Sequence, residues 1–153
     1  MANTFSQMYV QIVFAVRNRE NIIPQKNNEE LHKYISGVIK NRGQKLLAVN
    51  CMPDHVHIFV GFKPNICISD LVRDIKTATS MFIKERRWVK GLFYWQEGFG
   101  SFTYSHSQLT DVINYINNQE EHHHKKSFKE EYIELLKQFD IEYDEKYLFD
   151  WYE

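Results

Sequence analysis

Two histidines separated by a single residue are the first feature of this sequence that could do chemistry. His55 and His57 lie in residues 55–62, a strand-like segment in which Val56, Ile58, Val60 and Phe62 occupy the alternate positions. Side chains two positions apart on a strand point to the same face, and two such imidazoles can bind one metal ion through nitrogen. The same pattern also fits two half-buried histidines hydrogen-bonded within a sheet, so further ligands are needed to decide.

A tyrosine on a predicted helix is the second candidate. Tyr115, Gln119 and His122 are four and then three residues apart, so they share one helical face beside an apolar stripe. A hydroxyl, an amide oxygen and an imidazole would then lie near the sheet. Tyr115 could instead be an amphipathic edge residue with a packed ring and a hydroxyl in water, and spacing alone favours that interpretation.

Basic residues give weaker signals. Arg17 and Arg19 follow the first predicted strand, while Arg73 and Lys76 lie on the polar side of a predicted helix. These side chains could contact phosphates, although an ordinary solvated face explains them equally well. The run of three histidines within residues 121–126 points in several directions on a helix, so we expect a solvated helix end there, with His122 as the exception.

The elements that position these residues can be read from periodicity. Strands are expected at residues 8–16, 45–52, 55–62 and, in a kinked form, 93–104; helices are expected from Leu31 to a glycine stop at Gly43, from an N-cap near Ser69, from about Ser107, and from a capping box at Ser127. This order is the split βαβ arrangement of α+β, ferredoxin-like folds with an antiparallel sheet. We expect helices on one face, the histidine pair on the opposite, open face, and the tyrosine helix near it.

Composition sets the limits of the fold. A chain of 153 residues with 43% hydrophobic and 25% charged residues is typical of one globular domain. Residues 127–153 hold three basic and nine acidic residues, which leaves 16 basic and 11 acidic residues in the preceding part. We therefore predict a catalytic domain at residues 1–126 and an acidic helical extension at residues 127–153. The mildly basic body permits nucleic-acid contact without indicating it.

Motifs that are missing from the sequence exclude other classes. No apolar run approaches the roughly 20 residues that span a bilayer, and the start has no leader pattern, so we expect a cytoplasmic protein without a membrane partner. The sequence contains no GxxxxGK[ST] phosphate-binding loop, which argues against a nucleotide cofactor.

Three motifs in order resemble one known family. The motifs are PDHVH (residues 53–57), YWQEG (residues 94–98) and YINNQ (residues 115–119), with IVFA (residues 12–15) in the first strand. Together they resemble the single-tyrosine HUH transposases of small bacterial insertion sequences, over about residues 5–125. The resemblance implies that His55 and His57 are ligands of Mg²⁺ or Mn²⁺, that Gln119 is the third ligand, and that Tyr115 is the nucleophile.

The resemblance also implies a reaction and its partners. Tyr115 would attack single-stranded DNA at hairpin-flanked element ends, leaving a 5′-phosphotyrosine and a free 3′-hydroxyl that can be rejoined without ATP. A homodimer whose subunits could share active sites is expected on the same ground. Three rivals remain: a domesticated relative acting on host repetitive palindromes, a non-catalytic hairpin-binding module, and a metal-storing or metal-sensing protein that uses the seven histidines.

Overall fold

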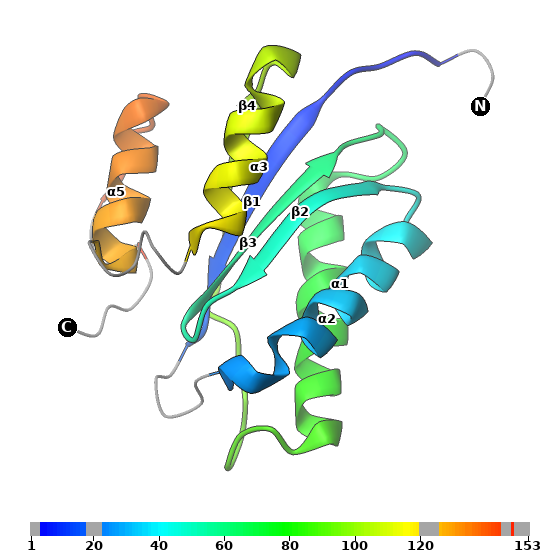
Figure 1. Ribbon diagram of the computed structural model, residues 1–153, viewed down its shortest axis with the longest axis vertical. Helices are drawn as coiled ribbons and strands as arrows, with labels where there is room; N and C mark the ends of the chain where they lie inside the picture. Colours follow the sequence, from blue (N-terminus) through cyan, green and yellow to red (C-terminus); the bar gives the residue numbers. More distant parts are fainter. Residues whose placement is uncertain (1–3, 18–22, 120–125, 145–147, 149–153) are drawn as a thin grey trace.

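The strands and helices of the protein follow the predicted order (Figure 1). The computed structural model describes residues 4–17, 23–119, 126–144 and 148. One antiparallel sheet is formed by β1 (Tyr9–Ala15), β2 (Lys45–Cys51), β3 (His55–Gly61) and β4 (Gly100–Tyr104), in the order β2-β3-β1-β4. With α1 (Asn28–Asn41) between β1 and β2 and α2 (Ile68–Arg86) between β3 and β4, this is the predicted ferredoxin-like arrangement.

β3 is an inner strand, paired on both sides. His57 lies opposite Val13 of β1 and opposite Asn50 of β2. Because the side-chain period of a strand is two, a slip of one residue would exchange its two faces, and pairing on both edges prevents that slip. The directions of His55 and His57 are therefore set by the sheet itself.

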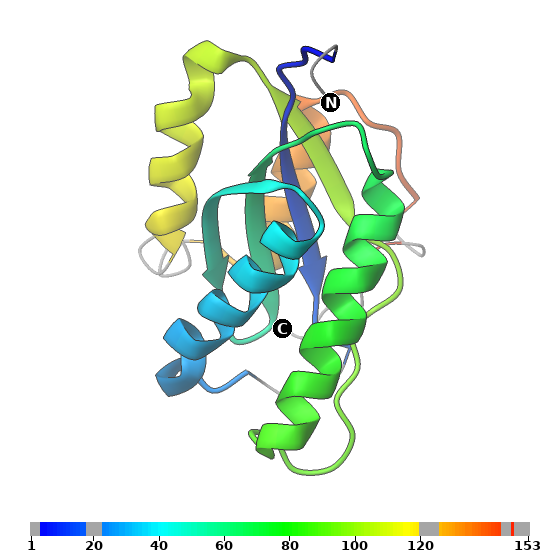
Figure 2. The same cartoon turned by 90° about the vertical axis from the view of Figure 1, so that its right-hand side faces the viewer.

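The face of the sheet under α1 and α2 holds the larger apolar core, and Figure 2 shows both helices in front of it. β1 contributes Ile12 and Phe14, and β3 contributes Val56 and Ile58, all fully buried. These residues occupy alternate positions, as the sequence predicts for a strand with one face on a core. α1 ends before Gly43, whose φ of +74° suits the predicted glycine stop.

Two predicted boundaries are wrong. The second helix begins at Ile68 and its N-cap is Cys67 rather than Ser69, because the carbonyl of Cys67 already accepts the first helical hydrogen bond from Leu71. Of the kinked strand expected at residues 93–104, only Gly100–Tyr104 pairs as β4. In the residues before it, Trp95 forms an isolated bridge with Val16 instead of continuing the strand.

The opposite face of the sheet carries α3 (Leu109–Asn117), which follows the short 3₁₀ helix η3 (His106–Gln108), and α5 (Phe128–Gln138). The tyrosine helix is thus near this face, as predicted, but the expectation of an open face is wrong. α5 packs apolar side chains against Val13, Ala15 and Phe102. The reason lies in β1, which is apolar at odd as well as even positions and so needs a cover on both faces.

Within the described residues, none of the helices combines the length and the apolar character needed to cross a lipid bilayer.

Candidate metal and nucleophile site

β3 places the two histidines side by side on the face under α3 and α5. His55 and His57 alternate with Val56 and Ile58, which enter the core on the other face. The two imidazole rings lie 5.1 Å apart between centroids and are 1% and 0% exposed. The predicted shared face is confirmed, and the site is enclosed by the helices above it.

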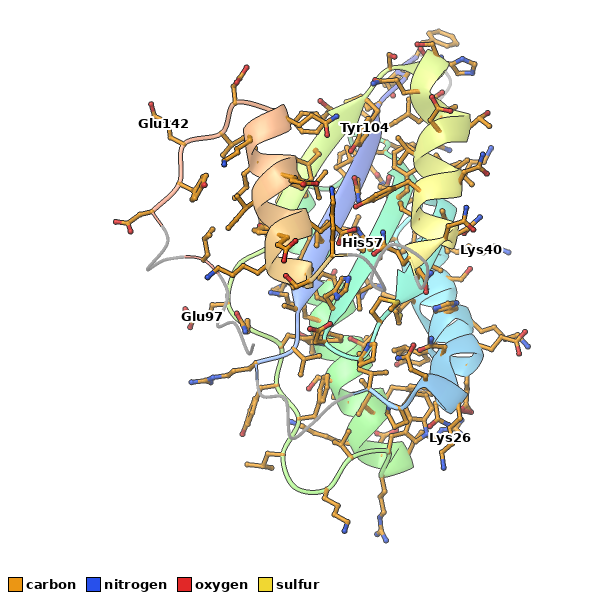
Figure 3. All side chains as sticks on the ribbon, turned by 60° about the vertical axis from the view of Figure 1, so that its left-hand side comes forward. Lys26, Lys40, His57, Glu97, Tyr104 and Glu142 are labelled. Atoms are coloured by element: carbon orange, nitrogen blue, oxygen red, sulfur yellow. The ribbon has the colours of Figure 1, made fainter. Side chains whose placement is uncertain are left out.

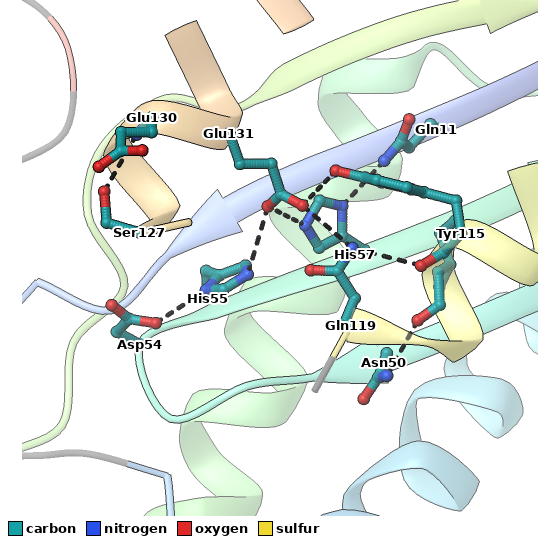
Figure 4. A network of polar contacts seen from close by, with 11 residues as sticks. Gln11, Asn50, Asp54, His55, His57, Tyr115, Gln119, Ser127, Glu130 and Glu131 are labelled. Carbon is teal, nitrogen blue, oxygen red and sulfur yellow. Dashed lines mark hydrogen bonds and ion pairs between the residues drawn. The ribbon is translucent and has the colours of Figure 1, made fainter. Parts of the chain in front are cut away.

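A carboxylate from α5 lies between the two imidazoles. Glu131 Oε1 is 2.9 Å from His57 Nε2 and 3.7 Å from His55 Nε2. Glu131 is itself only 5% exposed, and the ligand atoms of the three residues all lie within 4.8 Å of one another. Figure 4 shows this carboxylate at the centre of the polar network.

The predicted nucleophile reaches the same carboxylate. The Tyr115 hydroxyl donates a hydrogen bond to Glu131 Oε2, and its ring centroid is 6.0 Å from that of His57 (Figure 4). Gln119, two residues beyond the end of α3, donates from Nε2 to the same oxygen at 3.1 Å. The structure therefore brings His55, His57, Tyr115 and Gln119 together within one chain.

A second layer of polar groups orients the two histidines. Asp54 Oδ1 lies 2.7 Å from His55 Nδ1, so this nitrogen can donate its hydrogen to the carboxylate while Nε2 faces Glu131. His57 Nδ1 lies 2.8 Å from Gln11 Nε2, and the Tyr104 hydroxyl donates to Gln11 Oε1 at 2.7 Å. Figure 3 shows His57 and Tyr104 between the ribbons of α3 and α5. The Asp54 contact is of the kind that fixes the ring orientation and tautomer of a metal-binding histidine. At His57 the Gln11 amide donates to Nδ1, so the ring hydrogen lies on Nε2, toward Glu131 Oε1, and must leave before Nε2 binds an ion.

Burial changes the acid–base properties of the site. Burial, with a smaller contribution from the nearby His57, lowers the pKa of His55 against the opposing effects of Asp54 and Glu131. Burial is also the main reason why the pKa of Tyr115 is raised, and the adjacent Glu131 carboxylate raises it further. His55 is therefore held in the neutral form that binds metals, whereas the Tyr115 hydroxyl is held protonated.

A groove between α3 and α5 leads to this site. It has a volume of about 260 Å³, and both Tyr115 and Glu131 line it. Two more acidic side chains, Asp111 and Glu134, lie along the same groove. A phosphodiester entering here meets negative charge, so a cation at the histidine pair would be needed to offset the repulsion.

The donor set fits a divalent cation. Two imidazole nitrogens and a carboxylate oxygen suit Mn²⁺. Mg²⁺ favours oxygen ligands, so among these three donors it would bind the carboxylate best. The separations of 2.9 and 3.7 Å between Glu131 Oε1 and the two Nε2 atoms are those of donors that can share one ion at bonds of roughly 2.1 Å. The Asp54 carboxylate on His55 Nδ1 supports the same conclusion.

Glu131 is the residue that sequence reasoning missed. It belongs to the predicted acidic extension, yet it occurs in a buried stripe of α5. Counted from Phe128, this stripe contains Glu131 after three residues, Tyr132 after four and Leu135 after seven. A charged residue within the apolar stripe of a helix is unusual because a buried charge needs partners. That signal was present in the sequence, but only the packing of α5 shows what the partners are.

The predicted basic contacts divide into two kinds. Arg17 and Arg73 are exposed, with Arg17 beside the Tyr94 ring and Arg73 paired with Asp70 and Asp74. Lys76 instead donates to the backbone carbonyls of Gln96 and Gly98 at 2.8 and 2.7 Å, so its ammonium is engaged within the fold. Arg19 and His122 lie outside the described residues.

Comparison with known proteins gives the class and then the family. A histidine pair on the inner strand of a ferredoxin-like sheet, with a tyrosine brought to it by a helix, defines a single-tyrosine HUH enzyme. A family model described as "Transposase IS200 like" matches residues 4–119, which is most of the chain. The protein therefore belongs to the IS200-like transposases, and α5 lies beyond the matched residues.

Individual relatives agree with this assignment. The chain is 24% identical over 120 residues to the ISDra2 transposase TnpA of Deinococcus radiodurans, covering 74% of this chain and 84% of that protein. Its fold is similar to a putative transposase from the same species (TM-score 0.57, 22% identity, 76% of this chain and 94% of that one). It is also similar to a REP-associated tyrosine transposase bound to a REP hairpin (TM-score 0.60, 18% identity, 79% and 72%).

Proposed function

We propose that this transposase cleaves and rejoins single-stranded DNA beside hairpin ends, with Tyr115 as the nucleophile. One observation carries the proposal: the Tyr115 hydroxyl and the imidazoles of His55 and His57 converge on a single buried carboxylate within one chain. A phosphate bound beside this carboxylate would lie close to both the nucleophile and the histidine pair. The solved relative bound to a REP hairpin supports the choice of a hairpin substrate.

The reaction follows from the groups present. Tyr115 Oη bonds to the phosphorus, the bond from phosphorus to the 3′ oxygen breaks, and the tyrosine proton leaves to solvent as the 3′ oxygen gains one. The products are a 5′-phosphotyrosine and a free 3′-hydroxyl, and attack by another 3′-hydroxyl reverses the step. A Mg²⁺ or Mn²⁺ ion at His55 and His57, with Gln119 as the predicted third ligand, would withdraw charge from the phosphate.

The chain must also overcome the resting state of its nucleophile. A tyrosine has an ordinary pKa near ~10 and is a weak nucleophile at neutral pH. In the structure burial and Glu131 raise the pKa of Tyr115 further, so the hydroxyl keeps its proton until substrate arrives.

The test is formation of a covalent adduct. The full chain is incubated with Mn²⁺ and labelled single-stranded DNA carrying the hairpin ends, and the products are separated under denaturing conditions. The wild type should form an adduct, Tyr115→Phe should form none, and the exposed Tyr143→Phe should behave as the wild type. An adduct that persists in Tyr115→Phe would contradict the proposal, and hairpin binding without any adduct would favour the non-catalytic module.

The assembly is a separate proposal. We keep the homodimer as an expectation, although the rings of Tyr115 and His57 already lie 6.0 Å apart between centroids within one chain. Mixing Tyr115→Phe with His57→Ala subunits tests sharing. Restored cleavage supports shared sites, whereas no restoration indicates that each chain uses its own tyrosine.

A domesticated role remains the second candidate. The similarity to a transposase solved on a REP hairpin favours a relative that acts on host repetitive palindromes. The chemistry is the same in both cases, so only the DNA flanking the gene separates them: element ends indicate transposition, and scattered palindromes indicate the domesticated role.

A further inference from the structure

α5 contributes a side chain to the site from outside the part of the chain that the family model matches. That match ends at residue 119, whereas Glu131 lies on the first turns of Phe128–Gln138. Nevertheless Glu131 Oε1 faces both histidines, at 2.9 and 3.7 Å from their Nε2 atoms. A sequence comparison restricted to the matched residues would overlook it.

We infer that Glu131 is the third protein ligand of the divalent cation, and that α5 is therefore part of the metal site. The inference rests on the proposed function for the identity of the ion, but it concerns this chain's own residues. Gln119 then becomes a positioning residue that acts through Glu131 instead of a direct ligand.

The two oxygens of Glu131 have different partners, which supports this division of roles. Oε1 faces the imidazoles, while Oε2 accepts hydrogen bonds from the Tyr115 hydroxyl and from Gln119 Nε2. Gln119 thus turns its amide nitrogen, a group that cannot bind a cation, toward Glu131 Oε2. An ion held by Oε1 would leave Oε2 to hold the tyrosine beside it.

The docking of α5 explains how this carboxylate is kept in place. Phe128 stacks on the His55 ring at 4.0 Å and 11°, and Tyr132, Leu135 and Leu136 pack into the core shared with β1 and β4. Ser127 caps the helix by accepting from the amide of Glu130. These contacts hold Glu131 on the buried side of the helix, while its neighbour Glu130 is exposed.

Mn²⁺ binding to the full chain without DNA tests the inference. Glu131→Gln keeps the shape of the side chain and should weaken Mn²⁺ binding by at least about tenfold in calorimetry, since removing an outer contact alone costs about 10–100-fold. Glu130→Gln is the matched control and should bind as the wild type. Gln119→Ala should have a smaller effect than Glu131→Gln.

Other results would overturn it. Equal Mn²⁺ binding by Glu131→Gln would show that Glu131 is not a ligand, and tighter binding would show that its carboxylate competes with the ion. A larger loss in Gln119→Ala would make Gln119 the direct ligand. These outcomes are separable from the proposed function, because Tyr115→Phe should retain Mn²⁺ binding while losing the adduct.

A measurement on the unaltered chain covers the case in which a variant does not fold. If α5 supplies a ligand, Mn²⁺ should slow backbone hydrogen exchange across residues 128–138, because opening α5 would then cost the bond to the ion. Unchanged or faster exchange in α5 would mean that Mn²⁺ binds without Glu131, and the inference would be wrong.

Discussion

The same inner strands form both faces of the sheet, yet the two faces bury different kinds of side chain. One face lies under α1 and α2, and the other lies under α3 and α5. Along β3, Val56, Ile58 and Val60 enter an apolar core, whereas His55 and His57 enter a polar cluster. The first face gains stability from burying apolar area, and the second spends part of its buried surface on hydrogen-bonded groups. The apolar face therefore stabilises the strand register, and this register places the two histidines side by side on the other face.

The largest expected effect is a loss of stability on the apolar face. Phe14 is fully buried and meets the Trp95 ring edge-on at 4.8 Å. Phe14→Ala should lower the free energy of unfolding by about 3–5 kcal/mol, measured by urea denaturation, because it removes a large side chain and leaves a cavity. Mn²⁺ affinity of the folded fraction should stay unchanged. A matched loss of affinity would show that the two faces are not separable.

A smaller effect, on Mn²⁺ affinity instead of folding stability, is expected from replacing Asp54. Its carboxylate lies 2.7 Å from His55 Nδ1, and it is partly exposed, so removing it should cost little folding stability. Asp54→Ala should lower Mn²⁺ affinity by about 10–100-fold, because the His55 ring loses the group that orients it. Asp54→Asn, which keeps an acceptor oxygen, should retain part of the affinity. Equal affinities for Asp54→Ala and the wild type would remove Asp54 from the site.

The smallest expected effect is a dependence of stability on pH in the metal-free chain. Burial is the main cause that lowers the pKa of both His32 and His55 below the ordinary 6.5. As pH falls through about 6.5, the unfolded chain takes up protons that the native chain does not. The contribution of these two histidines to the free energy of unfolding should therefore be fully present above this pH and decline below it.

The contribution of His32 can be isolated from that of the site. His32 Nε2 accepts the backbone N–H of Cys51 at 3.1 Å, which requires the neutral ring. Urea denaturation at pH 7.5 and 5.5 should show a smaller loss of stability on acidification in His32→Asn than in the wild type. Stability that rises on acidification would contradict the direction of both shifts.

Much of this protein could be read from local pattern. Alternation along residues 8–16 and 55–62 predicted two strands and the shared face of His55 and His57, because a strand has a period of two whatever surrounds it. Helical spacing likewise linked Tyr115 to Gln119. The resemblance of three ordered motifs then pointed to the family, which the match over residues 4–119 shows.

Only the tertiary structure decided what covers the histidines and which oxygen faces them. Glu131 is separated from His57 by 74 positions in the chain, and no periodicity links residues so far apart. Its position depends on α5 folding back onto β1, where α5 buries the apolar side chains of Val13 and Ala15. Local sequence determines the direction in which a side chain leaves its own strand or helix. Which elements pack together depends on the burial of apolar surface between distant parts of the chain, so the complete site is visible only in the tertiary structure.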